Sequence, residues 1–306
     1  MMATLSDFVW NQLLITLLVG TGLLFTVASR FVQFRYFGRM FSVLASALHH
    51  EKGHVSSFQA LVVSVAGRVG GGNIAGVAVA ITLGGPGAIF WMWLIGLMGM
   101  ATSFFECSLA QLFKRYEEDG TFRGGPAYYL THGIRQRALA VIYSVLLLIT
   151  FGFGFNAVQS YVVATSLEQS FGVPSWASGL CMVVLLTVVF FGGIKRIAAV
   201  SEIIVPVMAL GYFGAALVVL ALNITEVPAV LAMIVKSAFG LDSAVGGGLG
   251  VALMQGVKRG LFSNEAGLGS APNVAAVAFV PHPVNQGIVQ AFSVFIDTIV
   301  MCTCTA

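Results

Sequence analysis

The sequence predicts an all-α polytopic membrane protein, on three observations. Hydrophobic residues make up 58% of the 306 residues and charged residues only 9%, whereas soluble domains carry about 25% charged residues. Long apolar runs, several with glycine inside them, recur along the whole chain. The basic residues gather on one side when those runs are threaded alternately through a bilayer. A chain of this composition needs lipid against much of its surface.

Eight segments are predicted to span the membrane, since about 30 Å of hydrocarbon requires roughly 20 apolar residues in a helix. The first has only Asp7 as a charged residue before or at its start, so it is predicted to be a retained span and not a signal peptide. The last two contain the least regular sequence. The eight segments are Phe8–Ser29, Ser57–Leu83, Ala88–Phe113, Ala138–Leu167, Ser175–Gly192, Ala198–Leu222, Val245–Gly256 with an irregular continuation, and Pro283–Ala306.

Charge placement predicts the orientation. Thirteen of the fifteen Lys and Arg residues follow spans one, three, five and seven, and therefore lie on one side. Lys236 is alone on the other side, and Arg68 lies within a span. The positive-inside rule makes the basic side cytoplasmic. We therefore expect a multi-pass protein of the cell inner membrane with its N-terminus outside.

A glycine run interrupts the second span. Gly70, Gly71 and Gly72 precede Asn73 at mid-span, and each glycine costs about 1 kcal/mol relative to Ala inside a helix. Backbone groups freed from a helix in hydrocarbon must face protein or a wet cavity. The run therefore favours a broken helix with a binding function. The alternative is a packing face, because Gly72 and Gly76 have the spacing of close helix–helix contacts.

A second glycine run, Gly246–Gly250, occurs in span seven and is followed by glycine and polar residues through Ser270. Interrupted helices at corresponding places in two halves of a chain are typical of a transporter binding site. Half-helix N-termini offer N–H groups to an anionic substrate group, and unwound carbonyls hold a cation. Close packing of small residues is again the alternative.

Polar side chains inside spans are further candidates, because ionisable groups in a membrane are costly. Arg68 and Glu106 are predicted at similar depth, where they would form an ion pair of structural or working character. Asp297, beside Thr298, is either a cation ligand or a helix–helix hydrogen-bonding group. Asn156 and Gln159 share one helix face. Gln159 suits a zwitterionic ligand because an amide both donates and accepts, and interhelical bonding is its alternative role.

Catalytic and metal-binding sets are missing from the sequence. The five histidines lie in predicted loops with no nucleophile or metal-ligand spacing around them. The four cysteines fall in apolar stretches. No phosphate-binding loop or channel filter motif is present. We therefore expect no enzyme, no cofactor, no transition-metal site and no nucleic-acid partner.

Several long stretches resemble the alanine or glycine:cation symporter family, also called the sodium:alanine symporter family. Together they run through most of the chain from about residue 57. The stretches are Val69–Ala78, Gly84–Trp93, Gly99–Ala110, Arg123–Tyr128, Arg259–Gly267 and Phe295–Thr298.

The resemblance implies a leucine-transporter-type inverted-repeat fold in a single transmembrane domain, 1–306. Residues 8–29 would be an extra N-terminal helix, 57–222 the first five-helix repeat and 245–306 the start of an incomplete second repeat. It also implies the site residues. Those for substrate are Gly70, Gly71, Gly72, Asn73, Gly154, Gln159, Gly246, Gly247 and Gly248, and those for sodium are Asn73, Asp297 and Thr298.

The function implied by the resemblance is symport of sodium with a small neutral amino acid, alanine or glycine, by alternating access. Gly71 stands where many members carry a hydroxyl residue, which leaves the substrate preference open. Family members have about eleven spans, so the chain is expected to be truncated after about eight. A non-transporting remnant of such a symporter is therefore the first alternative, and a channel is the second.

Overall fold

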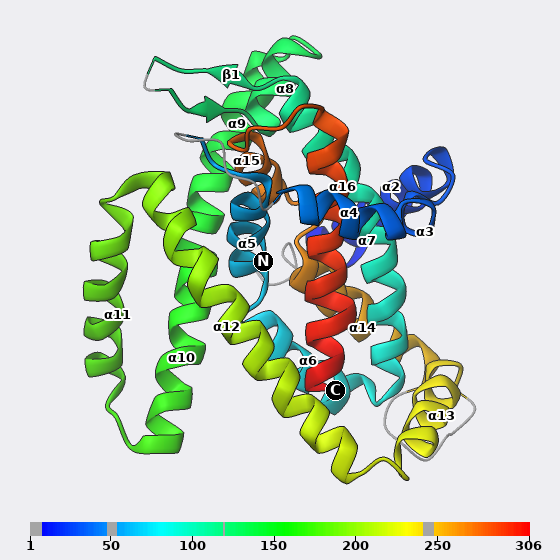
Figure 1. The fold of residues 1–306 in the computed structure, drawn as a ribbon. Coiled ribbons are helices and arrows are strands. Elements are labelled where there is room, and N and C mark those ends of the chain that lie inside the picture. The colour runs from blue at the N-terminus through cyan, green and yellow to red at the C-terminus, as the bar shows by residue number, and fades with distance from the viewer. Residues whose placement is uncertain (1–7, 48–53, 119, 241–247) are drawn as a thin grey trace.

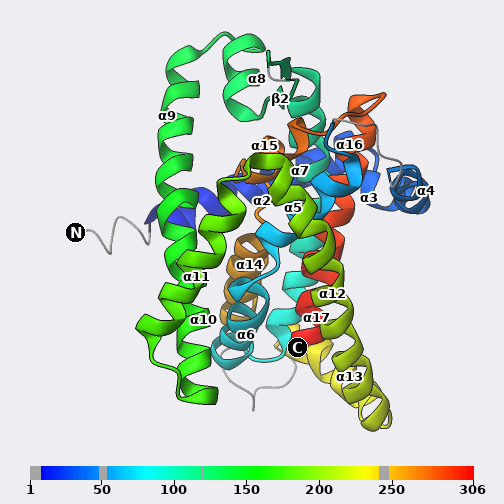
Figure 2. The same ribbon diagram turned by 60° about the vertical axis from the view of Figure 1, so that its left-hand side comes forward.

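The computed structural model describes residues 8–47, 54–118, 120–240 and 248–306, which form a bundle of helices with one short hairpin (Figures 1 and 2). The first half comprises η1 (Val9–Leu14), α2 (Ile15–Ala28), α3 (Val32–Arg35), α4 (Phe37–Ala47), α5 (Ser57–Arg68), η2 (Gly72–Gly76), α6 (Val77–Gly84), α7 (Gly87–Leu112), β1 (Arg115–Tyr116), β2 (Phe122–Arg123) and α8 (Pro126–His132). The second half comprises α9 (Arg137–Ile149), η3 (Thr150–Gly154), α10 (Phe155–Phe171), α11 (Ser175–Phe190), α12 (Gly193–Leu222), α13 (Val227–Ala238), α14 (Leu249–Asn264), α15 (Ser270–Ala276), α16 (Pro283–Val294), η4 (Phe295–Met301) and α17 (Cys302–Thr305).

Six of the predicted spans are confirmed as helices with the length and hydropathy to cross a bilayer. Among the described residues, five are unbroken and a sixth is a pair of helices that meet at a bend. The spans predicted at Ser175–Gly192 and Val245–Gly256 correspond to α11 and α14, which are helices of 16 residues each. The six spans are Val9–Ala28, Ser57–Arg68 with Gly72–Gly84, Gly87–Leu112, Arg137–Phe171, Gly193–Leu222 and Pro283–Thr305.

The prediction for the end of span seven is wrong. An irregular continuation after Gly256 is predicted, but α14 continues as a regular helix to Asn264. Gly256 serves packing: a Cβ added there would lie 2.4 Å from the carbonyl oxygen of Ala88, on α7. Lys258 and Arg259 consequently lie inside a helix beside α7 and not in a cytoplasmic loop, so they no longer contribute to the charge asymmetry.

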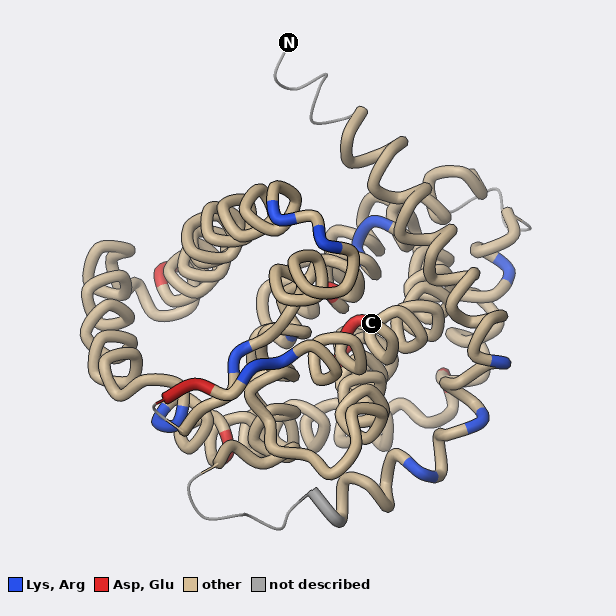
Figure 3. Tube along the Cα trace, turned by 90° about the horizontal axis from the view of Figure 1, so that it is seen from above, with Lys and Arg blue, Asp and Glu red and all other residues tan. Residues whose placement is uncertain are grey.

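The connections predicted on opposite sides of the bilayer do lie at opposite ends of the bundle. The hairpin of β1 and β2 and the short helix α8 form one end, and α13 lies at the other (Figure 1). The two strands pair antiparallel, with Tyr116 opposite Phe122. Seen from the hairpin end, most of the trace is uncharged, and Lys and Arg positions occur on several segments around it (Figure 3).

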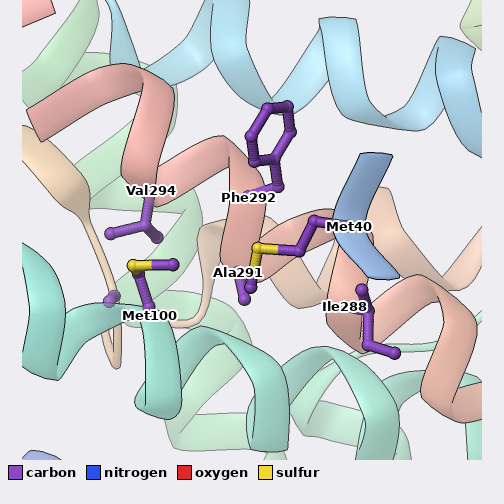
Figure 4. Packing of buried hydrophobic residues seen from close by; sticks show 7 residues of the cluster. Met40, Met100, Ile288, Ala291, Phe292 and Val294 are labelled. Atoms are coloured by element: carbon purple, nitrogen blue, oxygen red, sulfur yellow. The ribbon is translucent and has the colours of Figure 1, made fainter. Parts of the chain in front are cut away.

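Helix α7 is the central element, because it packs against α2, α6, α13, α14, α15 and α16. A buried apolar cluster fastens α4 to this core: Met40 of α4 packs with Met100 of α7 and with Ile288, Phe292 and Val294 of α16 (Figure 4). Met40 and Met100 are fully buried. The amphipathic helix α4 is thus anchored to α7 and α16 by the fully buried side chain of Met40, whose flexibility suits it to such contacts.

Helices α9 to α12 present apolar side chains outward. Leu186 of α11 is 67% exposed and Leu210 of α12 is 71% exposed. A continuous apolar surface of this extent marks contact with lipid or with further protein. It agrees with the membrane assignment made from composition.

Candidate functional site

The helix break predicted at the first glycine run is present. Helix α5 ends at Arg68, Val69 is extended (φ −75°, ψ 108°), and the chain resumes as helix at Gly72. The two parts, 57–68 and 72–84, are bent by 52°. The backbone between them leaves the helical hydrogen-bonding pattern at the glycine run, where the sequence predicts the break.

Side chains and not helix carbonyls satisfy the amides at this break. The Gly70 N–H donates to Oδ1 of Asn73 (2.9 Å), and the Gly71 N–H donates to Oε1 of Gln159 on α10 (2.8 Å). A Cβ added at Gly70 would lie 2.6 Å from Nε2 of Gln159. The close approach of Gln159 therefore depends on glycine at this position.

A cavity of about 460 Å³ lies beside the break. Gly70 and Arg68 line it from the first broken helix, Gln159 from α10, and Glu265 from the segment after α14. Arg68 is 3% exposed and Glu265 is 5% exposed, so one buried charge of each sign borders the cavity. The Nε atom of Arg68 is buried without a hydrogen-bond partner, as is the Oγ atom of the lining residue Ser64. The lining therefore holds free hydrogen-bonding capacity for a polar ligand.

A second helix break borders the same cavity. Helix α14 stops at Asn264 and α15 begins at Ser270, with positive φ at Glu265 (51°), Gly267 (86°) and Gly269 (88°). The Gly267 N–H donates to Oε2 of Glu106 (3.2 Å).

The glycine run predicted to form this second break lies elsewhere. Gly246 and Gly247 are outside the described residues, and Gly248 is the N-cap residue of α14. Gly154 is exposed and does not line the cavity. The signal that marks the observed break is the Glu-Ala-Gly-Leu-Gly sequence at 265–269, which was noted only as a continuation of the run.

The predicted ion-site residues are brought together by the two broken helices and α16 with η4. The Asp297 carboxylate is fully buried. It accepts hydrogen bonds from Nδ2 of Asn73 (2.7 Å), from Oγ1 of Thr298 (2.8 Å) and from Oγ of Ser263 (3.0 Å). Ser263 was not among the predicted site residues. The result is a buried cluster of oxygen atoms around one carboxylate. Asn73 connects this cluster to the first break, because it also bonds the Gly70 N–H.

The predicted ion pair between Arg68 and Glu106 is not formed. The Arg68 guanidinium donates instead to the hydroxyls of Ser103 and Ser293, and Glu106 accepts from Gly267. Arg68 still interacts electrostatically with Glu106, Glu265 and Asp297 at longer range. One buried cation thus lies within electrostatic range of three buried carboxylates and partly offsets the cost of burying them.

Five of the predicted site residues share an unusual backbone. Gly72 and Asn73 lie in the π-helical stretch η2, Gly154 in η3, and Asp297 and Thr298 in η4. Short π-helical stretches are rare and occur frequently at functional sites. The π-helical stretches η2 and η4 meet at the Asn73–Asp297 contact, whereas η3 is separate from it.

The described part of the chain contains no group of three or more His, Cys, Asp or Glu side chains placed to hold a metal ion. All four cysteines are free. The oxygen atoms around Asp297, by contrast, are the ligand type that hard cations prefer.

The profile of the sodium:alanine symporter family matches residues 1–306. A Bacillus subtilis protein named "probable sodium/glutamine symporter GlnT" is 51% identical over 302 residues, which cover 98% of this chain and 63% of that protein. The B. subtilis "amino-acid carrier protein AlsT" is 50% identical, with 98% and 64% covered. The Methanococcus maripaludis "sodium/alanine symporter AgcS" is 42% identical, with 99% and 68% covered. The chain thus spans less than two thirds of the length of the two B. subtilis relatives.

Proposed function

Because the chain belongs to the sodium:alanine symporter family, we propose that it couples sodium entry to uptake of a small neutral amino acid by alternating access. The observation that carries the proposal is the cavity of about 460 Å³ where two broken helices and Gln159 meet. We place the protein in the cell inner membrane, with its N-terminus outside and the hairpin end in the cytoplasm. The inverted-repeat architecture is part of the same proposal.

The substrate site proposed here is the cavity beside Gly70, Gly71, Gly72 and Asn73. In this structure the Gly71 N–H donates to Oε1 of Gln159 at 2.8 Å. A substrate carboxylate would take over such amide donors at the start of the second half-helix, where the helix dipole favours negative charge. Displaced from Gly71, the Gln159 amide would then bond the ligand. We leave Gly154 and Gly248 out of this proposed site, because neither lines the cavity.

Sodium is proposed to bind at the Asp297 carboxylate with Asn73 and Thr298. Asn73 connects the two sites, since its Oδ1 accepts from the Gly70 N–H and its Nδ2 donates to Asp297. A cation that rearranged the Asn73 side chain would therefore alter the break that holds the substrate. This shared residue is a physical route for coupling, because each ligand would change the other's affinity by the same factor.

The experiment is uptake by proteoliposomes that contain the 306-residue chain. Radiolabelled alanine, glycine, serine and glutamine are offered with an inward sodium gradient, with choline in place of sodium, and with a proton gradient alone. We expect saturable uptake that requires sodium and prefers one of these substrates, since relatives are named for both alanine and glutamine. Uptake unaffected by sodium would reject the coupling, non-saturating flux would favour a channel, and no uptake would reject transport by the 306-residue chain.

The variant Gln159→Ala tests the site itself. Losing a hydrogen bond to a charged ligand group costs about 1.5–3 kcal/mol, so substrate affinity should fall at least about tenfold. Gln169→Ala on the exposed face of the same helix is the matched control and should bind normally. Equal substrate affinity in the two variants would remove Gln159 from the site.

A further inference from the structure

A second cavity, of about 600 Å³, lies on the other side of Phe155 from the substrate cavity. Phe155 lines both cavities and stacks on Phe262 of α14, with ring centroids 5.2 Å apart. The second cavity lies between α14, the N-terminal π-helical stretch η1 and the stretch η3. It takes no part in the transport site proposed above.

The charge of this second cavity is one-sided. Lys258 and Arg259 both line it, and none of the other lining residues is acidic. The remaining polar groups of the lining, on Trp10, Thr150 and Gln255, all include a hydrogen-bond donor. Cations inside a membrane protein are ordinarily paired with an anion.

Neither cation has a protein partner within the part of the chain that the structure describes. The Nε atom of Arg259 is buried, and its N–H donates to no acceptor among the described residues. Its aliphatic stem packs toward Gly76, where an added Cβ would lie 3.9 Å from Cδ. Arg259 and Lys258 are both half-buried and both line the cavity, so two positive charges border it and one buried donor is free.

We propose that this cavity is a binding site for a small monovalent anion, held by Lys258 and Arg259. The chemistry is that of a carboxylate or a halide: one negative charge, several acceptor lone pairs and a size well below the cavity volume. Arginine and lysine donors form their strongest hydrogen bonds with such charged acceptors. The carboxylate of a free amino acid and an inorganic chloride both fit this description, and the experiment separates them.

The test uses iodide as the probe, because Trp10 lies in the cavity wall and iodide quenches tryptophan fluorescence on contact. The purified chain in detergent is titrated with sodium iodide exchanged against sodium methanesulfonate, so that sodium stays constant. We expect a saturable quenching component that disappears in Trp10→Phe. Chloride should compete with it, and competition by alanine but not by alaninamide would identify the amino-acid carboxylate as a ligand. Competition by chloride alone would identify an inorganic-anion site.

Lys258→Met and Arg259→Met should each weaken iodide binding by about tenfold or more, as expected for loss of a charged hydrogen bond. Lys258→Arg keeps the charge and should retain saturable quenching, which guards against a simple folding defect. Lys236→Met, which alters an exposed lysine of α13, is the matched control. Linear quenching that is equal in the wild type and the Met variants would overturn the proposal, since the cavity would then hold only water. Gln159→Ala should leave the quenching unchanged, so this result does not depend on whether the chain transports.

Discussion

At the scale of single residues, Asp297 is the residue on which the proposed ion site depends. Its carboxylate is fully buried and accepts from Asn73, Ser263 and Thr298. These three donors are neutral, so they leave the negative charge of the carboxylate in place. A cation bound beside it would be attracted strongly, because the surroundings have a low dielectric constant.

Replacing Asp297 by Asn should therefore raise the sodium concentration for half-maximal uptake at least about tenfold, with a smaller effect on the substrate. The measurement is initial uptake rate against sodium concentration in proteoliposomes. Glu226→Gln, at an exposed carboxylate, is the control and should behave as the wild type. A normal sodium dependence in Asp297→Asn would mean that the carboxylate only holds the helices together.

The residues of the site were partly predictable from sequence. A polar residue inside an apolar run is conspicuous, and this revealed Asn73, Gln159 and Asp297. Ser263 and Glu265 escaped because they belong to a stretch rich in glycine and polar residues, where nothing in the local sequence distinguishes a ligand-facing residue from a loop residue. The partners of Arg68 escaped for another reason: which hydroxyls lie within reach of a guanidinium depends on how α5, α7 and α16 pack.

At the scale of helices, glycine has two uses that spacing alone does not separate. In the run at Gly70–Gly72 it lies at a helix break, as predicted, and there it also leaves room for Gln159. At Gly256 and Gly260 it lets α14 lie directly against α7, and the helix continues through both. Both places are rich in glycine, so the local sequence does not separate a helix break from a helix–helix contact. The packing of the neighbouring helix determines which of the two forms.

A test of the packing role compares two glycines of α14. Gly256→Ala puts a methyl group 2.4 Å from the backbone oxygen of Ala88, so the helices must separate, at a cost of about 1–3 kcal/mol. Gly250→Ala meets no atom within 4 Å and should be neutral or stabilising by up to about 1 kcal/mol. Thermal unfolding of the purified variants measures both. Equal melting temperatures would contradict the close contact between α14 and α7.

At the scale of the whole molecule, one polar and aromatic cluster at the hairpin end joins segments that are far apart in sequence. Lys114, just beyond α7, donates to the carbonyl of Ala278 (2.7 Å) and lies 4.0 Å from the ring centroid of Phe122. His54 stacks on Phe279, with ring centroids 5.2 Å apart. Desolvation lowers the pKa of Lys114 from 10.5 to about 8.

This lowered pKa predicts a rise of stability with pH. Between about pH 8 and 10.5 the unfolded chain keeps the Lys114 proton and the folded chain has released it. The unfolded state then binds more protons, so the free energy of unfolding increases through this window. Lys114→Met should lose that increase, and Lys236→Met should retain it, as measured by melting temperature against pH in detergent. A parallel pH profile in wild type and Lys114→Met would contradict the desolvation of Lys114.

The bridge between Val55 and Ala278 has a mechanical consequence. It runs parallel, with the Phe279 N–H donating to the Val55 carbonyl at 2.9 Å. Val55 lies just before α5, and Ala278 lies just after α15. The bridge therefore joins the start of the first interrupted helix, α5 with α6, to the end of the second, α14 with α15. If one of the two half-helices moved at this end and the other did not, this hydrogen bond would have to break. The bridge therefore favours movement of the two half-helices together.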